Sequence, residues 1–296
     1  MTSKPDESST TTMARESVDH AWLGDALPEV PLSKSQARVV EVIARNPQLS
    51  SYADIAEIAQ RSDVNNSTVV RTAQRLGYRG WPDLQRELRS RYLVMISTED
   101  TLLEHGEHHS PLHDALNHDI ENLRLTLDSN TAEDVEAAIA ALASAKSITT
   151  IGIGSFAGPA SVMAHLGSTM GYPITLENRG GVHLASAANS LGPGDVLVVV
   201  NMWRSVQQII VTAEAAKQSG ATVVAISDMR RGRLAAAADH LLIVASEGIS
   251  FFQSVTAANS MVYGLLAGME AAHPERSRAA IRRTQQLWKD LDIYLD

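Results

Sequence analysis

Residues 50–78 contain the feature that most constrains the fold of this chain, the segment SSYADIAEIAQRSDVNNSTVVRTAQRLGY. Apolar residues recur at helical spacing on both sides of a short polar turn at Ser62–Val64. Asn65 is a favourable N-cap for the second helix, and Gly77 is typical of the position just after a helix. Two short helices around a tight turn, the second opening with small polar residues and carrying arginines, indicate a helix-turn-helix that reads DNA.

The surrounding sequence predicts further helices that would complete an all-α N-terminal domain over residues 29–97. Pro47 disfavours helical backbone for Asn46 and therefore predicts the end of the helix before it. The four expected helices cover about Ser33–Arg45, Ala53–Arg61, Asn65–Leu76 and Asp83–Ile96.

The third of these helices is expected to enter the major groove, because its first two turns carry side chains that hydrogen-bond to base edges. The residues that we expect to contact DNA there are Asn65, Asn66, Ser67, Thr68, Arg71 and Thr72. Lys34, Arg75 and Arg79 are better placed to contact phosphates.

The charge distribution agrees with this assignment, although the whole chain carries a net charge of −9. Between Pro31 and Tyr92 there are ten Lys and Arg residues against six Asp and Glu, so this segment is basic on an otherwise acidic chain. The excess of positive charge is small, so we expect the chain to bind duplex DNA as an oligomer, a homodimer or a homotetramer.

Other compositional features exclude several classes of protein. The chain has no cysteine, which excludes disulfides and thiolate metal sites and is compatible with the cytoplasm. Residues 1–28 are rich in Ser, Thr, Asp and Glu and predict a disordered tail without a signal peptide. No apolar run is long enough to span a membrane, and residues 98–112 have the mixed polar composition of a linker.

From Ser147 onward, short apolar runs alternate with helical segments, which predicts an α/β domain over residues 113–296. Runs as apolar as these indicate strands that are buried on both faces of a parallel sheet. We expect a three-layer, flavodoxin-like domain with strand order 2-1-3-4-5. The five expected strands are Ile148–Ile153, Pro173–Glu177, Val196–Asn201, Thr222–Ser227 and Leu241–Ala245.

The segment ITTIGIGSFAGPA places three glycines where the first strand turns into a helix. Gly154 and Ser155 there could hold an anion at the helix N-terminus. One interpretation is a Rossmann-type NAD site, with Glu177 at the end of the next strand. The other is a sugar isomerase (SIS) domain.

A family resemblance favours the SIS interpretation. The segment NNSTVVRTAQRLGYRGWPDL resembles the N-terminal domain of MurR/RpiR regulators, which join a helix-turn-helix to an SIS domain. Asp63 departs from the family, which usually has glycine in the turn, but aspartate tolerates the left-handed conformation. The resemblance implies a DNA-binding regulator, expected to be a repressor, without catalytic residues or cofactor.

The loop after the third strand departs from SIS domains that bind phosphosugars. Those domains have a Ser-x-Ser-Gly-x-Thr loop, whereas this chain has Asn201, Trp203, Arg204 and Ser205 in the corresponding stretch. A guanidinium can still bind an anion, so we expect a small anionic, possibly sugar-derived effector; Arg204 as a surface or interface residue is the alternative.

Other candidates are Ser227 and Glu247, which follow later strands at the edge where ligands bind in such sheets. His105, His109 and His113 are spaced for zinc, but Gly106 and Pro111 interrupt the helix, so we expect no metal site. Competing functions are an SIS-type sugar-phosphate isomerase and an NAD-binding redox sensor.

Overall fold

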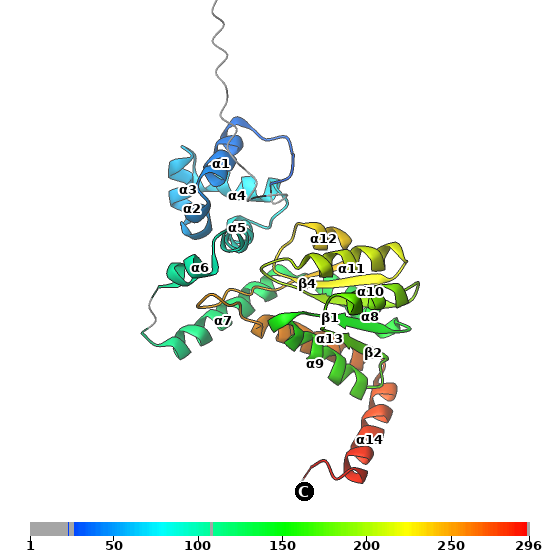
Figure 1. The fold of residues 1–296 in the computed structure, drawn as a ribbon. Coiled ribbons are helices and arrows are strands. Elements are labelled where there is room, and N and C mark those ends of the chain that lie inside the picture. The colour runs from blue at the N-terminus through cyan, green and yellow to red at the C-terminus, as the bar shows by residue number, and fades with distance from the viewer. Residues whose placement is uncertain (1–22, 24–26, 107–108, 295–296) are drawn as a thin grey trace, which may run out of the picture.

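The computed structural model describes residue 23 and residues 27–106 and 109–294, which form a helical N-terminal domain and an α/β C-terminal domain (Figure 1). The N-terminal domain consists of α1 (Lys34–Arg45), α2 (Pro47–Tyr52), α3 (Ile55–Arg61), α4 (Asn66–Arg75) and α5 (Trp81–Met95). The four helices expected from the sequence are present, within two residues of their expected ends.

Helix α2 is not among the expected helices, because the sequence pattern assigns Pro47 only to the end of the helix before it. Pro47 does follow the end of α1, but it also occupies the first turn of α2. Proline is favourable there, because a backbone N–H in the first turn of a helix would have no acceptor within the helix, and because the φ of proline is already helical. The same residue therefore ends one helix and begins the next.

The N-terminal domain has its own apolar core. Val39, Ile58, Val69 and Leu84 are fully buried in it. Leu23 belongs to the same cluster although it falls in the expected disordered tail, so ordered packing begins at least that early; residues 1–22 and 24–26 lie outside the described residues.

Three helices connect the N-terminal domain to the sheet: α6 (Thr98–His105), α7 (Pro111–Ser129) and α8 (Ala132–Ser144). Helix α6 occupies much of the segment that was expected to be a linker. Ser97 caps it by accepting a hydrogen bond from the backbone N–H of Asp100, and two acidic residues lie in its first turn.

The C-terminal domain contains one five-stranded parallel sheet of order β2-β1-β3-β4-β5, which confirms the expected topology. Its strands are β1 (Ile148–Ile151), β2 (Ile174–Glu177), β3 (Val196–Val200), β4 (Thr222–Ser227) and β5 (His240–Ile243). The helices between them are η1 (Gly154–Phe156), α9 (Ala157–Thr169), α10 (Val182–Ser190), α11 (Gln207–Gln218) and α12 (Arg233–Ala237).

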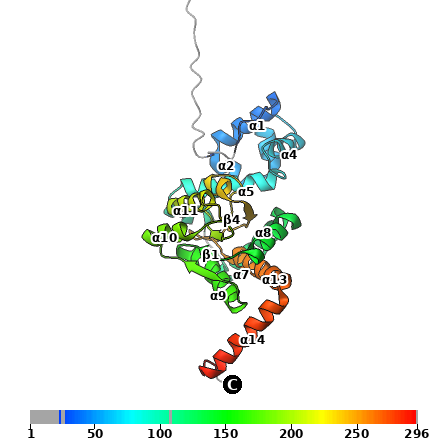
Figure 2. The same ribbon diagram turned by 90° about the vertical axis from the view of Figure 1, so that its right-hand side faces the viewer.

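Alternate residues of each strand face opposite layers of helices, and every residue of β3 is buried. Val196, Val198 and Val200 pack with α8, α9 and α13 (Thr256–Ala272), whereas Leu197 and Val199 pack with α10, α11 and α12. Figure 1 shows these two layers on either side of the sheet. The last helix, α14 (Pro274–Asp290), projects away from the body at the end opposite the N-terminal domain (Figure 2).

Among the described residues, none of the helices combines the length and the apolar character that a membrane span requires.

The turn from β1 into α9 depends on Gly152. A Cβ atom at this position would lie 2.3 Å from the carbonyl oxygen of Phe156, so any other residue must displace backbone. Gly158, on the first turn of α9, has open space where a Cβ would lie. The two glycines therefore differ in what they contribute.

We expect Gly152→Ala to lower the unfolding free energy of the C-terminal domain by about 1–3 kcal/mol, because overpacking against backbone strains the turn. Gly158→Ala should leave it unchanged or raise it by up to about 1 kcal/mol, because alanine favours helix. Urea denaturation of both variants tests this, and equal effects would contradict the assigned role of Gly152.

Candidate nucleic-acid interface and ligand site

The turn between α3 and α4 is held by α1. Asp63 has φ of +50°, which confirms the left-handed conformation expected for it. The guanidinium of Arg38 donates to the carbonyl oxygens of Ser62 at 3.0 Å and Asp63 at 2.7 Å. Arg38 therefore fixes the angle at which α4 leaves the turn, a role that its position in the sequence did not suggest.

Asn65 caps α4 through a single atom. Its side-chain oxygen accepts hydrogen bonds from the backbone N–H of Thr68 and from the hydroxyls of Ser67 and Thr68, all within 2.9 Å. The cap uses only the oxygen of the side-chain amide, and the role that the structure shows for Asn65 is to cap the N-terminus of α4.

The expected DNA contacts divide into two groups. Asn66, Ser67 and Arg71 are exposed on α4, as Lys34, Arg75 and Arg79 are elsewhere on the domain. The Nη2 atom of Arg71 lies 3.3 Å from the Ser67 hydroxyl, and Arg75 donates to the carbonyl oxygen of Pro31 at 3.1 Å.

Thr68 and Thr72 are buried, which contradicts the expectation that they contact bases. Thr72 is fully buried, and its hydroxyl donates to the carbonyl oxygen of Thr68. Gln74, which is not among the expected contacts, is also exposed on α4. The spacing Ser67, Arg71, Gln74 follows one face of a helix and was the available signal.

At the carboxyl edge of the sheet, the loop after β3 is bound to the end of β4. Asn201 is buried, and its side-chain oxygen accepts from the backbone N–H of Val206. Trp203 has φ of +56°, and its backbone N–H lies 3.0 Å from both carboxyl oxygens of Asp228. The loop is thus held in a strained conformation by a buried acid.

Arg204 connects this loop to α5. Its guanidinium lies 4.8 Å from the centre of the Trp203 ring and donates to the carbonyl oxygen of Ile96 at 3.2 Å. Arg204 and Ser205 line a cavity of about 650 Å³ together with residues near the end of α5. Arg204 is therefore both an interface residue and a residue of a cavity wall.

The other expected ligand residues are distributed around the edge of the sheet. Gly154 and Ser155 are exposed at the start of η1 and line neither the Arg204 cavity nor the cavity beside Glu247 described below. Ser227 is buried, and its hydroxyl accepts from the backbone N–H of Met229. The structure therefore does not gather all the expected residues in one cavity.

Helix α5 is bound to the C-terminal domain through buried acids; we call this contact the interdomain seam, formed by α5 and the loops after β3, β4 and β5. Arg230 lies 3.0 Å from the carboxylate of Asp83, and its backbone N–H donates to Glu87 at 3.0 Å. Arg86 also pairs with Asp83, and Arg91 with Glu87. Burial lowers the pKa of Arg86, and the nearby Asp83 opposes that shift.

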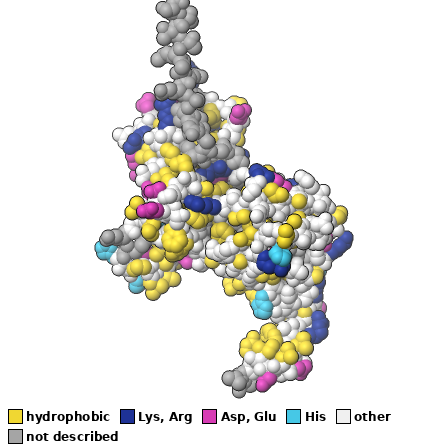
Figure 3. Space-filling view, in the orientation of Figure 1, with side chains coloured by type: hydrophobic (Ala, Val, Ile, Leu, Met, Phe, Trp, Pro, Cys, Tyr) yellow, Lys and Arg dark blue, Asp and Glu magenta, His cyan; other side chains and the backbone are white. Residues whose placement is uncertain are grey.

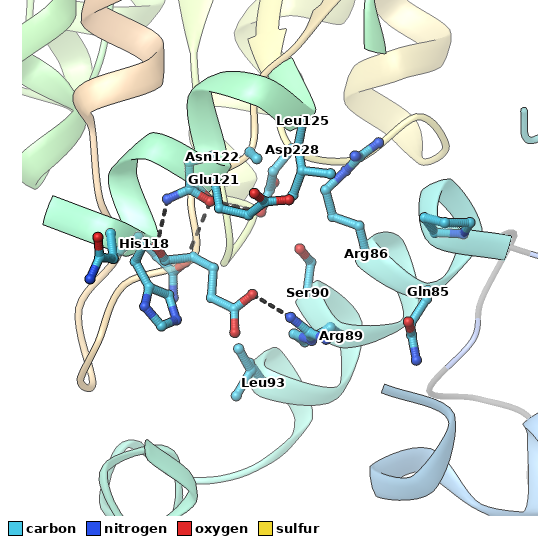
Figure 4. Close-up of a pocket in the computed structure, with 16 residues that line it drawn as sticks. Gln85, Arg86, Arg89, Ser90, Leu93, His118, Glu121, Asn122, Leu125 and Asp228 are labelled. Carbon is cyan, nitrogen blue, oxygen red and sulfur yellow. Dashed lines mark hydrogen bonds and ion pairs between the residues drawn. The ribbon is translucent and has the colours of Figure 1, made fainter. Parts of the chain in front are cut away.

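A second cavity, of about 370 Å³, lies within the interdomain seam (Figure 4). Arg89 of α5 reaches across it to Glu247 at 2.6 Å, and Asn122 of α7 donates to the carbonyl oxygen of Glu247 at 2.8 Å. Glu247 therefore carries an ion pair to the N-terminal domain, which argues against a free catalytic base at this position.

The acid expected of an NAD site is also engaged. Glu177, at the end of β2, accepts three hydrogen bonds from Arg179, and these bonds hold the pKa of its carboxyl below the usual value. A ribose hydroxyl would have to compete with this pair, so the geometry favours the SIS interpretation.

The histidines of the α6–α7 segment do not converge. His105 bonds to the carbonyl oxygen of Thr101, and His113 to the hydroxyl of Ser110. Within the described part of the chain, which omits His108, no three His, Asp or Glu side chains are grouped to hold a metal ion.

Comparison with known proteins agrees with both domains. Residues 28–93 match the helix-turn-helix domain of the rpiR family, and residues 141–268 match the SIS domain. An uncharacterized HTH-type transcriptional regulator of Caldanaerobacter subterraneus is 26% identical over 73% of this chain and 77% of its own length. The HTH-type transcriptional regulator HexR of Escherichia coli is 25% identical over 66% and 68%. The chain belongs to the RpiR family.

Solved structures support the same fold. The sugar isomerase domain of an RpiR transcription factor from Sphaerobacter thermophilus is 28% identical, with a TM-score of 0.58 over 60% of this chain and 99% of that domain. The Vibrio vulnificus NanR protein, complexed with ManNAc-6P, is 20% identical, with a TM-score of 0.60 over 88% and 95%. This RpiR chain is thus a transcriptional regulator with a helix-turn-helix and an SIS domain.

Asp228 is the residue of this RpiR chain that most connects the loops. It accepts hydrogen bonds from the Trp203 backbone and from the hydroxyls of Ser246 and Ser90, the last of which lies on α5. Burial nevertheless raises the pKa of its carboxyl. The expected ligand residues did not include it, because a single acid after a strand is more often a turn residue.

A raised pKa means that the folded RpiR chain binds the proton of Asp228 more tightly than the unfolded chain does. The contribution of this group to stability is therefore present at low pH and is lost as pH rises through the raised pKa. Asp228→Asn removes the titration and keeps one acceptor oxygen.

We expect the unfolding free energy of the wild type relative to Asp228→Asn to fall above about pH 4, by about 1.4 kcal/mol for each unit by which the pKa is raised. Urea denaturation across pH measures it, with exposed Asp128→Asn as the control. A difference that does not change with pH would contradict the role given to burial.

Proposed function

We propose that this chain is a DNA-binding regulator, acting as a repressor in the cytoplasm, that binds a duplex operator through the exposed face of α4. The observation that carries the proposal is that face itself: Ser67, Arg71 and Gln74 lie along it, and Asn66 is exposed at its start. These side chains match the hydrogen-bonding groups of base edges. The Asn65 cap and the Arg38 contacts hold the helix in position.

Lys34, Arg75 and Arg79 would contact phosphates on either side of α4. Their charge is sequence-independent and salt-sensitive, so it sets register and affinity and does not distinguish bases. Thr68 and Thr72 are left out of the proposed interface because they are buried.

We also propose that a small anionic, sugar-derived metabolite controls operator affinity from the C-terminal domain. Arg204 supplies the cation, beside Trp203 and Ser205 in the loop after β3, and Ser155 follows β1 at the same edge of the sheet. NanR, which shares the fold, is complexed with ManNAc-6P, a compound of this class. Because Arg204 also binds the end of α5, an anion on its guanidinium would compete with an interdomain contact.

We expect no catalysis by the C-terminal domain. Glu247 is paired with Arg89, and the phosphosugar loop of hydroxyl residues is absent after β3. Neither feature suits an isomerase, which needs a free base beside its bound sugar.

Selection of bound duplexes from random DNA tests the DNA-binding proposal. The wild type should enrich a two-fold symmetric motif, and Arg71→Ala should weaken its binding by about 1–3 kcal/mol and relax one position of the motif. Arg278→Ala, on α14 at the opposite end of the molecule, is the matched control and should bind as the wild type does. Failure of the folded wild type to enrich any motif would refute the proposal.

A two-fold symmetric operator requires two copies of the chain, and α7 offers a surface for their contact. Its exposed apolar side chains recur every three or four residues along one face: Leu112, Leu116, Ile120, Leu123 and Leu127. Figure 3 shows hydrophobic side chains on the α6–α7 segment and around the end of α14. We propose that a second copy of this chain covers the α7 face, because a row of this kind is costly to leave in water.

Light scattering tests that contact. We expect the wild type to be at least a dimer and the double variant Leu116→Glu, Leu123→Glu to be a monomer, because buried carboxylates without partners oppose association. The control variant Val211→Glu, at an exposed position of α11, should keep the wild-type mass. A monomeric wild type, or an unchanged double variant, would exclude the α7 face as the contact.

A further inference from the structure

The cavity in the interdomain seam is lined by four separate parts of the chain, one of them the loop after β4, which contributes Asp228. Helix α5 contributes Arg89 and Leu93, helix α7 contributes Asn122 and Leu125, and the loop after β5 contributes Gln253. Figure 4 shows the α5 and α7 side chains facing one another across the space. Its volume of about 370 Å³ is within the usual range for small-molecule sites.

This cavity differs in place from the proposed anion site. It lies at the carboxyl ends of β4 and β5, beside Asp228 and Glu247, whereas Arg204 follows β3 and lines the other cavity. An occupant of the seam cavity would therefore not depend on the loop that lost its hydroxyl residues.

Both arginines that line the cavity are already paired with acids. Arg89 pairs with Glu247, and Arg86 pairs with Asp83, so neither guanidinium is free to bind an anion. Glu121 and Asp228 add two further carboxyl groups to the lining. A phosphate or carboxylate would meet the three carboxyl groups of Glu121, Asp228 and Glu247 and only two guanidiniums, both already paired, so the lining disfavours an anionic ligand.

Hydrogen-bonding groups remain available to an uncharged ligand. Gln253 lines the cavity, and its side-chain nitrogen is buried without a hydrogen-bond partner; the oxygen of the same amide lies 3.4 Å from the Ser246 hydroxyl, which also contacts Asp228. A buried donor without a partner costs about 1–3 kcal/mol, which a turn of this amide toward a ligand oxygen would recover. Leu93, Leu125 and Ala245 supply apolar surface beside these groups.

We propose that the seam cavity binds a small uncharged polyhydroxy compound, a sugar or polyol that carries no phosphate. Hydroxyl groups both donate and accept, so they suit the carboxylates and amides of this lining, and the C–H face of a sugar ring suits its leucines. The ligand contacts α5 and the C-terminal domain together, and it favours the arrangement of domains in which α5 covers the strand ends.

Isothermal titration and saturation-transfer NMR on the full chain test the site, with glucose, N-acetylglucosamine, ribose and sorbitol as probes. Each sugar is compared with its terminal phosphate ester. We expect saturable binding of at least one uncharged probe, with a Kd of about 1 mM or tighter. Gln253→Leu should weaken that binding at least tenfold, and Gln218→Leu, which alters an exposed glutamine of α11, should not.

Two further variants separate this site from the proposed anion site. Leu125→Trp, which fills the cavity from α7, should abolish binding of the uncharged probe and spare the phosphate esters. Arg204→Ala should weaken binding of the phosphate esters and spare binding of the uncharged probe. Circular dichroism confirms that each variant is folded.

The proposal is overturned if none of the four uncharged probes binds, or if binding is indifferent to both Gln253→Leu and Leu125→Trp. It is equally overturned if a phosphate ester binds more tightly than its parent sugar and Gln253→Leu weakens the binding of that ester. These results are independent of the duplex selection, so the DNA-binding proposal stands or fails separately.

Discussion

The pairing of Arg230 with two buried acids of α5 is the interaction on which the arrangement of the two domains depends. Asp83 and Glu87 are almost completely buried, and a buried carboxylate is tolerated only when it is paired and hydrogen-bonded. Arg230 contacts both, through its guanidinium and its backbone N–H, and its guanidinium also donates to the carbonyl oxygen of Ser129. Moving α5 away would remove the Arg230 contacts and leave these acids with partners from the N-terminal domain alone.

Because α5 is held in this way, it serves as a wall for both cavities as well as a helix of the DNA-binding domain. Its beginning packs in the N-terminal core through Leu84 and Leu88, and its end accepts the Arg204 hydrogen bond. A ligand in either cavity would therefore act on a helix that is continuous with the domain carrying α4. The contact is direct, so no chain of intermediate residues is needed to connect ligand and operator.

Local patterns predicted most of the fold. The strands of the sheet are short apolar runs that alternate with helical segments, a pattern typical of parallel strands connected through helices, so the topology could be predicted before any contact was known. Helix α2 and the ordering of Leu23 could not, because each depends on packing in the N-terminal core. Thr72 shows the same limit within a correctly predicted helix: its type suits a base contact, but the docking of α4 against α1 and α3 buries it.

The residues of the interdomain seam were harder to predict, because the seam joins positions far apart in the chain. Arg89 and Glu247 are separated by 158 residues, and neither position is unusual within its own segment. An exposed arginine on a basic domain would ordinarily be assigned to DNA, yet Arg89 faces the C-terminal domain. Charge counts therefore overestimate the DNA-binding surface of this domain, since Arg86, Arg89 and Arg91 all bind carboxylates of the chain itself. The positive charge left for the proposed DNA contacts comes from Arg71, on the base-reading face, and from Lys34, Arg75 and Arg79, which are few for one copy of the chain.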